Sequence, residues 1–352
     1  MPQHDPAGEA TTATAPCRVD LAGGTLDIWP LYLFHSGAVT VNFAVNILTR
    51  CRISSLPGTR IELKSLDTGK SENFRSLDEL CGARKFAHPL AAELVRFFAP
   101  EGGFSLETHS ESPAGAGISG SSALMVATTA ALARFTGREL SLEEIRVIAQ
   151  NVEAQLIRVP TGCQDYYPAL YGGASAIHLE ADGIHRQAIR VAAEEIDDRF
   201  VLAYTGAPRQ SGINNWKVFK AHIDGDKKVF RNFEQIAAIA RALHEALANA
   251  DWSEVAALLR QEWKLRKTNA PRITTPLIEK LIKAATKNGA RAAKVCGAGG
   301  GGCVVFLGEP DAKHRIEDAI RSAGGTILPC KVAREGLALA GSSSAAVQLA
   351  SN

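Results

Sequence analysis

The chain has 352 residues, of which 46% are hydrophobic and 22% charged, and its formal net charge is +2. This length exceeds what one hydrophobic core usually holds, so two domains are expected, and the composition is that of a globular protein. Basic residues form no dense stretch interleaved with aromatics, which argues against a nucleic-acid partner, and no run of about 18 apolar residues can span a membrane.

The seven cysteines are scattered along the chain, and none stands in a Cys-x-x-Cys pair. A disulfide framework and a cysteine metal cluster are therefore not expected. Residues 1–15 are small and polar and lack the apolar centre of a signal peptide. We therefore expect a cytoplasmic protein with no membrane partner, and the sequence carries no prediction of its oligomeric state.

Residues 1–15 and 341–352 are expected to form flexible tails around two domains, at 16–195 and 196–340. In the first domain, short runs rich in Val, Ile and Leu predict strands, and longer periodic runs predict helices. The strands are expected at 17–22, 38–46, 49–54, 104–108 and 174–179, and the helices at 122–135 and 142–158. Ser141 and Glu144 form a capping box at the start of the second helix.

The second domain is expected to begin with a strand and to alternate helices with strands. The strands are predicted at 200–204, 292–295, 303–307 and 326–332, and the helices at 232–249, 253–267, 276–288 and 312–323. The helix at 276–288 has Thr275 as a cap, Pro276 at its first position and Gly289 as a stop signal. Strands and helices mixed in both parts predict an α+β fold class.

The most informative segment is Pro-Ala-Gly-Ala-Gly-Ile-Ser-Gly-Ser-Ser-Ala at 113–123, which leads directly into a predicted helix. Small residues let a ligand approach the backbone, and the first amides of a helix have no partner within it. With the positive end of the helix dipole, these amides form a site for phosphate. No Lys follows the glycines, so the segment is not a Walker loop. An ordinary flexible turn is the alternative.

Three further segments carry candidate site residues. Asp27 follows a Gly23-Gly24 turn, where a carboxylate can accept hydroxyl protons of a sugar, although a surface aspartate has the same pattern. Glu153 and Asp165 are separated by a helix end and a turn, so one can face a cation and the other a substrate hydroxyl. Mg²⁺ needs few protein oxygens beside nucleotide phosphates, and Glu153 with a loop serine suffices. A solvated helix position is the alternative for Glu153.

The last segment places five glycines within residues 297–302, between two predicted strands. Consecutive glycines lose much conformational entropy on folding, so they are expected where backbone must approach other backbone or a phosphate. Hydrophobic strands flank the segment closely, which excludes a loose linker.

In this order, the four segments resemble the GHMP superfamily of small-molecule kinases, which includes galactokinase, homoserine kinase and mevalonate kinase. The resemblance extends over about residues 15–335. The Ala-Gly-Gly turn at 22–24 is most similar to the heptose-phosphate and fucose kinase branch, whereas Gly24 and Thr25 replace the Glu-His of galactokinase. The resemblance implies a two-domain fold with an N-terminal α/β domain that carries the phosphate loop and a ferredoxin-like C-terminal domain.

The resemblance also implies roles for individual residues. Asp165 and Arg18 take the catalytic positions, and Mg²⁺ is bound by Glu153 and by Ser121, with Ser122 as the other serine that matches. Substrate-binding positions fall on Asp27, Thr25, Gly162, Gln164, Arg209 and Ser211. ATP-binding positions fall on Pro113, Gly115, Ala116, Gly117, Ile118, Ser119, Gly120, Ser121, Ser122, Gly299 and Gly300.

The function expected from the resemblance is an ATP-dependent sugar kinase that uses Mg²⁺. Its acceptor is expected to be the anomeric hydroxyl of a hexose or heptose, including one that already carries a phosphate, such as heptose 7-phosphate. A non-sugar alcohol, such as mevalonate or a homoserine-like amino alcohol, is the alternative acceptor. A nucleotide- or sugar-binding protein without catalytic activity is the alternative from another class.

Overall fold

The structure, a computed structural model, describes residues 10–208 and 213–341. Its larger sheet has the strand order β12-β1-β2-β5-β3-β4, and β6 pairs with both β2 and β7. The strands are β1 (Thr11–Ala22), β2 (Val39–Leu56), β3 (Ile61–Ser65), β4 (Lys70–Phe74), β5 (Gly103–Ser110), β6 (Ala174–Leu179), β7 (Ile184–Ala188) and β12 (Ala338–Ala340).

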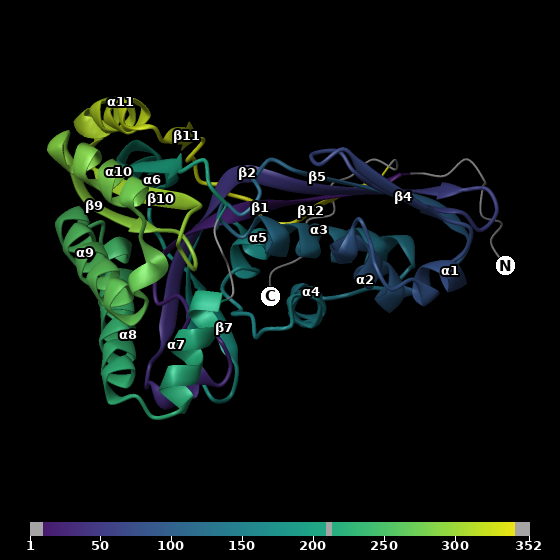
Figure 1. The fold of residues 1–352 in the computed structure, drawn as a ribbon, viewed down its shortest axis with the longest axis horizontal. Helices are drawn as coiled ribbons and strands as arrows, with labels where there is room; N and C mark the ends of the chain where they lie inside the picture. Colours follow the sequence, from purple (N-terminus) through teal and green to yellow (C-terminus); the bar gives the residue numbers. More distant parts are fainter. Residues whose placement is uncertain (1–9, 209–212, 342–352) are drawn as a thin grey trace.

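Five helices from the same half of the chain lie along one face of this sheet (Figure 1). They are α1 (Leu77–Gly82), α2 (Pro89–Phe98), α3 (Gly120–Phe135), α4 (Leu142–Ile157) and α5 (Tyr167–Tyr171). The central helix α3 is buried almost all round, which suits its run of small and apolar residues. The predicted capping box is confirmed, because Ser141 and Glu144 each accept a hydrogen bond from the other's backbone.

The second sheet belongs to the C-terminal half and has the order β11-β8-β10-β9, with every pair antiparallel. Its strands are β8 (Phe200–Tyr204), β9 (Ala290–Val295), β10 (Cys303–Gly308) and β11 (Thr326–Leu328). Helices precede β9, and α11 (Lys313–Ala323) separates β10 from β11. This order of elements is the ferredoxin-like βαββαβ arrangement, so the predicted fold class is confirmed.

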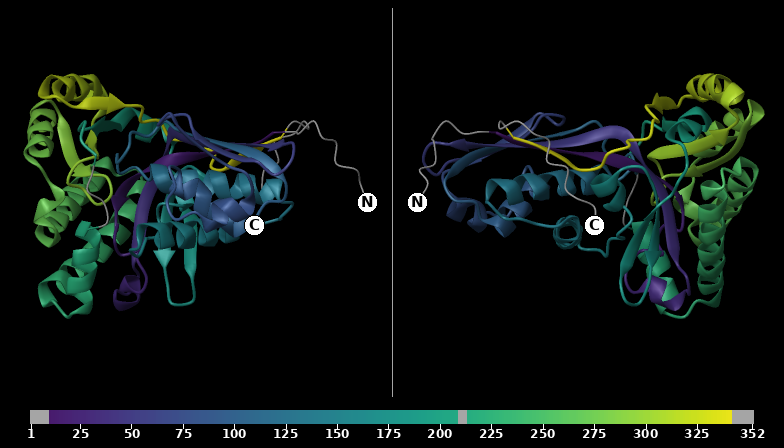
Figure 2. Two further views of the ribbon diagram at one scale, coloured as in Figure 1. Left: turned by 45° about the vertical axis from the view of Figure 1, so that its right-hand side comes forward. Right: turned by 180° about the vertical axis from the view of Figure 1, so that it is seen from behind.

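The remaining helices gather around the second sheet and the end of β2 (Figure 2). They are α6 (Ala193–Arg199), α7 (Ile213–Ile223), α8 (Lys227–Ala248), α9 (Trp252–Asn269) and α10 (Pro276–Lys287), with short 3₁₀ turns η1 (Leu31–Phe34), η2 (Pro271–Ile273) and η3 (Pro310–Ala312). None of the helices in the described residues is long and apolar enough to cross a bilayer.

The structure differs from the sequence prediction in several places. Strand β1 begins at Thr11, inside the expected tail, because buried Ala13 and Ala15 let this segment pair with β2 and β12. The two strands expected at 38–46 and 49–54 are one strand of 18 residues, β2. Between residues 55 and 100, where no element was expected, β3, β4, α1 and α2 form.

The two glycine-rich segments meet through their backbones. We call residues 113–122 the first glycine loop and residues 297–302 the second glycine loop. The amide of Cys303 donates to the carbonyl of Ala116 at 2.7 Å, and Gly302 adopts φ +75° beside that carbonyl. A β-carbon on Gly302 would lie 2.6 Å from the Ala116 oxygen, so this position requires glycine. The backbone of the second glycine loop therefore packs directly against the backbone of the first.

Replacing Gly302 by Ala should destabilise the protein more than replacing Gly206 by Ala. Both glycines have nearly the same φ, +75° and +76°, but a β-carbon at Gly206 meets nothing within 4 Å. The matched pair therefore isolates the clash with Ala116, which we expect to lower the free energy of unfolding by about 1–3 kcal/mol more in G302A. Urea denaturation of both variants measures the difference, and equal losses would contradict the contact.

Candidate active site

Two cavities meet at the start of α3, and Ser121 is the one described residue that lines both. The Asp165 cavity has a volume of about 380 Å³ and is lined by residues from β1, α4, the 159–166 turn and α7. The first-loop cavity has a volume of about 400 Å³ and lies along the first glycine loop. Volumes of this size suit small-molecule ligands.

The first-loop cavity brings together most of the predicted nucleotide-binding residues. Its lining includes Pro113, Gly115, Ala116, Gly117, Ser119, Gly120 and Ser121. Ser119 adopts φ +60°, an uncommon conformation for a serine, where the chain turns into α3. The first amides of α3, which have no partner within the helix, therefore lie at this cavity.

The remaining predicted nucleotide-binding residues lie elsewhere. Ile118 is buried, and its carbonyl accepts the amide of Arg18. Ser122 lines the Asp165 cavity, and Gly299 and Gly300 lie against Ile273, outside the lining of both cavities. Contact of Gly299 and Gly300 with a nucleotide stays a prediction.

The far end of the first-loop cavity contains residues that the sequence analysis missed. The turn between β3 and β4 contributes a connected polar group, in which Thr68 donates to Ser65 at 2.7 Å and Ser65 donates to Asp67 at 3.0 Å. His88, at the start of α2, lies in the same lining. In the sequence this segment has the pattern of an ordinary polar hairpin turn, which carries no functional signal.

Arg18 holds Asp165 in the second cavity. The guanidinium donates twice to one carboxylate oxygen, Oδ1, at 2.9 and 2.5 Å, and once to the carbonyl of Gly117 at 2.8 Å. Arg18 is 1% exposed, whereas the Asp165 side chain is 25% exposed. Burial opposes the charge on Arg18, but the carboxylates of Asp165 and Asp20 raise its pKa above the usual value. Asp165 Oδ2 accepts no hydrogen bond from the described residues.

Glu153 lies in a group of hydroxyls beside Asp165. Ser121 donates to one of its carboxylate oxygens at 2.7 Å, and Ser122 and Tyr166 donate to the other at 2.9 and 2.6 Å. Burial raises the pKa of Glu153, and the three hydroxyls oppose that shift. A carboxylate with two serine hydroxyls is a hard-oxygen donor set, which fits Mg²⁺. Ser121 is exposed and lies at the junction of the cavities, whereas Ser122 is buried.

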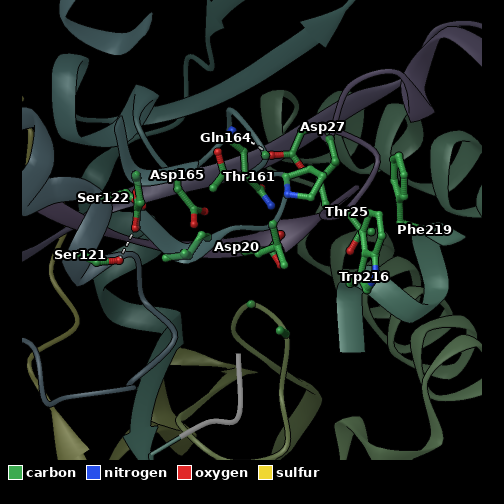
Figure 3. A pocket seen from close by; sticks show the side chains of 18 of the residues that line it. Asp20, Thr25, Asp27, Ser121, Ser122, Thr161, Gln164, Asp165, Trp216 and Phe219 are labelled. Carbon is green, nitrogen blue, oxygen red and sulfur yellow. Dashed lines mark hydrogen bonds between the residues drawn. The ribbon is translucent and has the colours of Figure 1, made fainter. Parts of the chain in front are cut away.

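Asp27 is buried in the lining of the same cavity. Its Oδ2 accepts the amide of Gln164 at 2.9 Å, and Gly162 packs so closely that any β-carbon there would overlap the carboxylate. Burial raises the pKa of Asp27 to about 7, against the lowering effect of the Gln164 hydrogen bond. Thr25 precedes it with φ +80°, a strained conformation for a β-branched residue. Figure 3 shows Asp27, Gln164 and Thr25 together.

A cluster of buried charged residues near Asp27 was also not predicted from the sequence. Lys294 contacts Asp20 at 3.1 Å and Glu262 at 3.4 Å, and Arg266 contacts Glu262 at 3.5 Å. Arg266 also donates to the carbonyls of Gly24, at 3.3 Å, and of Gly297, at 3.1 Å. It therefore links the Gly23-Gly24 turn to the second glycine loop. In the sequence, Glu262 and Arg266 have the pattern of a solvated helix face, and Asp20 and Lys294 lie in predicted strands.

Helix α7 forms the wall of the Asp165 cavity that lies farthest from Ser121. Trp216 and Phe219 stack with ring centroids 5.6 Å apart, and Figure 3 shows both rings at the opposite end from Ser121 and Asp165. Lys217 lines the cavity beside them and has no ion-pair partner in the described part of the chain. The predicted substrate residues Arg209 and Ser211 lie outside the described residues.

The sequence matches known proteins along almost its whole length. The GHMP kinases N terminal domain matches residues 84–173, and the GHMP kinases C terminal domain matches residues 243–326. A D-glycero-alpha-D-manno-heptose 7-phosphate kinase from Campylobacter jejuni is 28% identical over 330 residues, covering 92% of this chain and 96% of the relative. The chain belongs to the GHMP kinases. It is therefore a phosphotransferase with an alcohol group as acceptor and ATP as donor.

Two further relatives show the breadth of the family. A mevalonate kinase from Thermococcus onnurineus is 29% identical over 263 residues, covering 70% of this GHMP kinase and 72% of the relative. The crystal structure of a D-glycero-D-manno-heptose 1-phosphate kinase from Bacteroides thetaiotaomicron has a TM-score of 0.76 and 23% identity, covering 95% of this chain and all of the other. The structural likeness confirms the fold.

Replacing Asp27 by Asn should stabilise this GHMP kinase more at pH 8.5 than at pH 5. The pKa of Asp27 rises from 3.8 to about 7 on folding, so its contribution to stability falls as pH rises through that window and stays low above it. Asn at this position does not ionise, so the variant does not lose this stability as pH rises. We expect the gain at pH 8.5 to exceed the gain at pH 5 by about 2 kcal/mol. Denaturation at both pH values measures the two gains in stability, and Asp198→Asn, at an exposed position, is the control. Equal gains at the two pH values would contradict the effect of burial on Asp27.

Proposed function

We propose that this GHMP kinase transfers the γ-phosphoryl group of ATP to the anomeric hydroxyl of a hexose or heptose. The observation that carries the proposal is the junction at Ser121. Ser121 lines both the first-loop cavity, with its helix amides, and the second cavity, whose lining includes Asp165, Glu153 and Asp27. A phosphoryl group bound beside Ser121 therefore has the backbone amides of the first glycine loop on one side and the carboxylates of the Asp165 cavity on the other.

The donor side binds phosphate through backbone amides and helix α3. The amides around Ser119 and Gly120 hold the phosphate oxygens, and the positive end of the helix dipole favours their charge. Glu153 and Ser121 would hold Mg²⁺, which neutralises charge on the transferring phosphoryl group when bound. The exposed hydroxyl at the junction supports Ser121 over Ser122 as the serine ligand.

Asp165 takes the proton of the acceptor hydroxyl. Arg18 occupies only Oδ1, so Oδ2 is available to accept a hydrogen bond from the hydroxyl. As the new oxygen–phosphorus bond forms and the bond to the leaving diphosphate breaks, the hydroxyl proton passes to Oδ2. The buried guanidinium holds the carboxylate in one orientation and offsets the negative charge at the junction.

The acceptor side favours a sugar over an apolar alcohol. Asp27 and Gln164 present hydrogen-bonding groups in the middle of the cavity, and the stacked rings of Trp216 and Phe219 offer an apolar face for a sugar ring. Arg18 is paired with Asp165, and Arg266 with Glu262, which leaves Lys217 as the unpaired cation among the described lining residues. We therefore propose that the acceptor carries a phosphate at the end remote from its reacting hydroxyl.

A panel of acceptors tests this assignment. Heptose 7-phosphate, mannose, fucose, galactose, mevalonate and homoserine are compared in a coupled assay of ADP release, with phosphorus NMR to identify the product. We expect turnover of the phosphorylated sugar, and Lys217→Met should lower its kcat/KM by about tenfold through loss of a charge-assisted contact. Lys220→Met, on the same helix but paired with Asp224, is the control. Preference for mevalonate would identify the alternative acceptor, and ATP binding without any turnover would identify an inactive protein.

Replacing Asp165 by Asn should lower kcat by about 10²–10⁴. The amide oxygen still accepts from Arg18, so the turn keeps its geometry, but the side chain no longer takes a proton. Calorimetry should show nucleotide binding unchanged, because Asp165 does not line the first-loop cavity. Turnover near that of the natural enzyme would exclude Asp165 as the base.

A further inference from the structure

A pair of histidines lies buried behind the acceptor side of the Asp165 cavity. His35 follows η1 in the loop between β1 and β2, and His222 is the second-last residue of α7. Their Nε2 atoms are 2.9 Å apart, and the residues are 3% and 5% exposed. The two rings are therefore in direct hydrogen-bond contact with little access to water.

The pair is enclosed by aromatic rings. Phe230 stacks on His222, with centroids 5.1 Å apart, and contacts His35 at 4.7 Å. Phe233 lies 5.9 and 5.8 Å from the same two rings, and Phe34 lies 5.6 Å from His222. In the neutral pair, one Nε2–H donates to the lone pair of the other Nε2. Neither Nδ1 atom has a hydrogen-bond partner in the described structure.

The segments that carry the two histidines both contribute walls of the acceptor cavity. The β1–β2 loop, which carries His35, lines the cavity through Thr25, Asp27 and Ile28. Helix α7, which carries His222, lines the same cavity through Trp216 and Phe219, and Phe219 lies one turn from His222. The histidine contact therefore joins the two walls at their far ends.

We propose that the His35–His222 pair is a positioning pair, which fixes α7 against the β1–β2 loop and so keeps the wall formed by Trp216 and Phe219 closed on the acceptor. The proposal rests on the assignment of the Asp165 cavity to the acceptor. Because the first-loop cavity shares no residue with either segment, the pair acts on acceptor binding and leaves nucleotide binding unchanged.

The chemistry of the pair makes this contact sensitive to acid. One added proton leaves an Nε2–H that still donates to the other Nε2, whereas a proton on each ring makes two N–H groups face each other, so the hydrogen bond is lost and two like charges are left among phenyl rings. Burial, together with His222, lowers the pKa of His35 to about 4, and burial lowers that of His222, so the pair is neutral at physiological pH. The contact therefore opens only below that value, where both rings are protonated.

The charged groups on the packed segments lie outside the aromatic cage. On α7, Lys220 is paired with exposed Asp224. On α8, Asp226 caps the helix, and Arg241 donates to the carbonyls of Ser36 and Gly37. The η1 turn contributes Tyr32, whose pKa is raised by burial. A proton on the histidine pair therefore meets no carboxylate within the cage.

The first test breaks the pair at pH 7.5. His222→Ala should raise the KM for the acceptor by about tenfold, because it leaves the His35 Nε2 buried without a partner. The KM for ATP should stay within about twofold, since nucleotide binding does not involve the pair. His222→Gln, which can still hydrogen-bond to His35, should restore most of the acceptor KM, and Lys220→Ala is the control on the same helix. Equal rises in both KM values would overturn the proposal.

The second test needs no turnover, so it separates failure of this proposal from failure of the proposed function. Hydrogen–deuterium exchange of the peptide that spans α7 is measured by mass spectrometry in the natural protein and in both His222 variants. We expect faster exchange in α7 of His222→Ala and natural rates in His222→Gln. Unchanged exchange of α7 in His222→Ala overturns the proposal.

Discussion

The geometry of this GHMP kinase depends on one buried guanidinium. Arg18 donates to Asp165 and to the carbonyl of Gly117, while its own backbone amide donates to Ile118. A rigid planar group with five donors can serve both partners at once, which a lysine cannot. Strand β1 thereby fixes the distance between the first glycine loop and the acid that faces the acceptor. Arg18 and Asp165, which are 147 positions apart in the sequence, are thereby held in direct contact.

Buried charge is the recurrent feature around this site. Asp20, Asp27, Glu153 and Glu262 are all less than a tenth exposed, and such burial lowers stability unless partners compensate. Lys294 and Arg266 compensate for two of them, and hydroxyls compensate for Glu153. Asp27 has no cation partner among the described residues, and burial raises its pKa to about 7. A dry, charged site costs stability, but it strengthens each electrostatic contact that a transferring phosphoryl group makes.

The two sides of the site are built differently. The nucleotide side consists of short backbone turns supported by the second glycine loop through Ala116. The acceptor side consists of side chains that come from distant segments, including the β1–β2 loop, the 159–166 turn and α7. Backbone turns suit a ligand common to a family, whereas side chains on a helix such as α7 can change between members without disturbing the fold. The histidine pair lies on this acceptor side.

The sequence by itself determined the family, most core strands and helices, and four segments: the one with Arg18 and Asp27, the first glycine loop, the one with Glu153 and Asp165, and the second glycine loop. Glycine turns, caps and hydrophobic periodicity are local signals, so they can be read without coordinates. Only the tertiary structure brought Lys294 and Arg266 to Asp20, placed Thr68 and His88 at the first-loop cavity, and paired His35 with His222. A buried charge or a histidine pair has no local pattern, because its partner lies on another segment and burial exists only after the chain has packed.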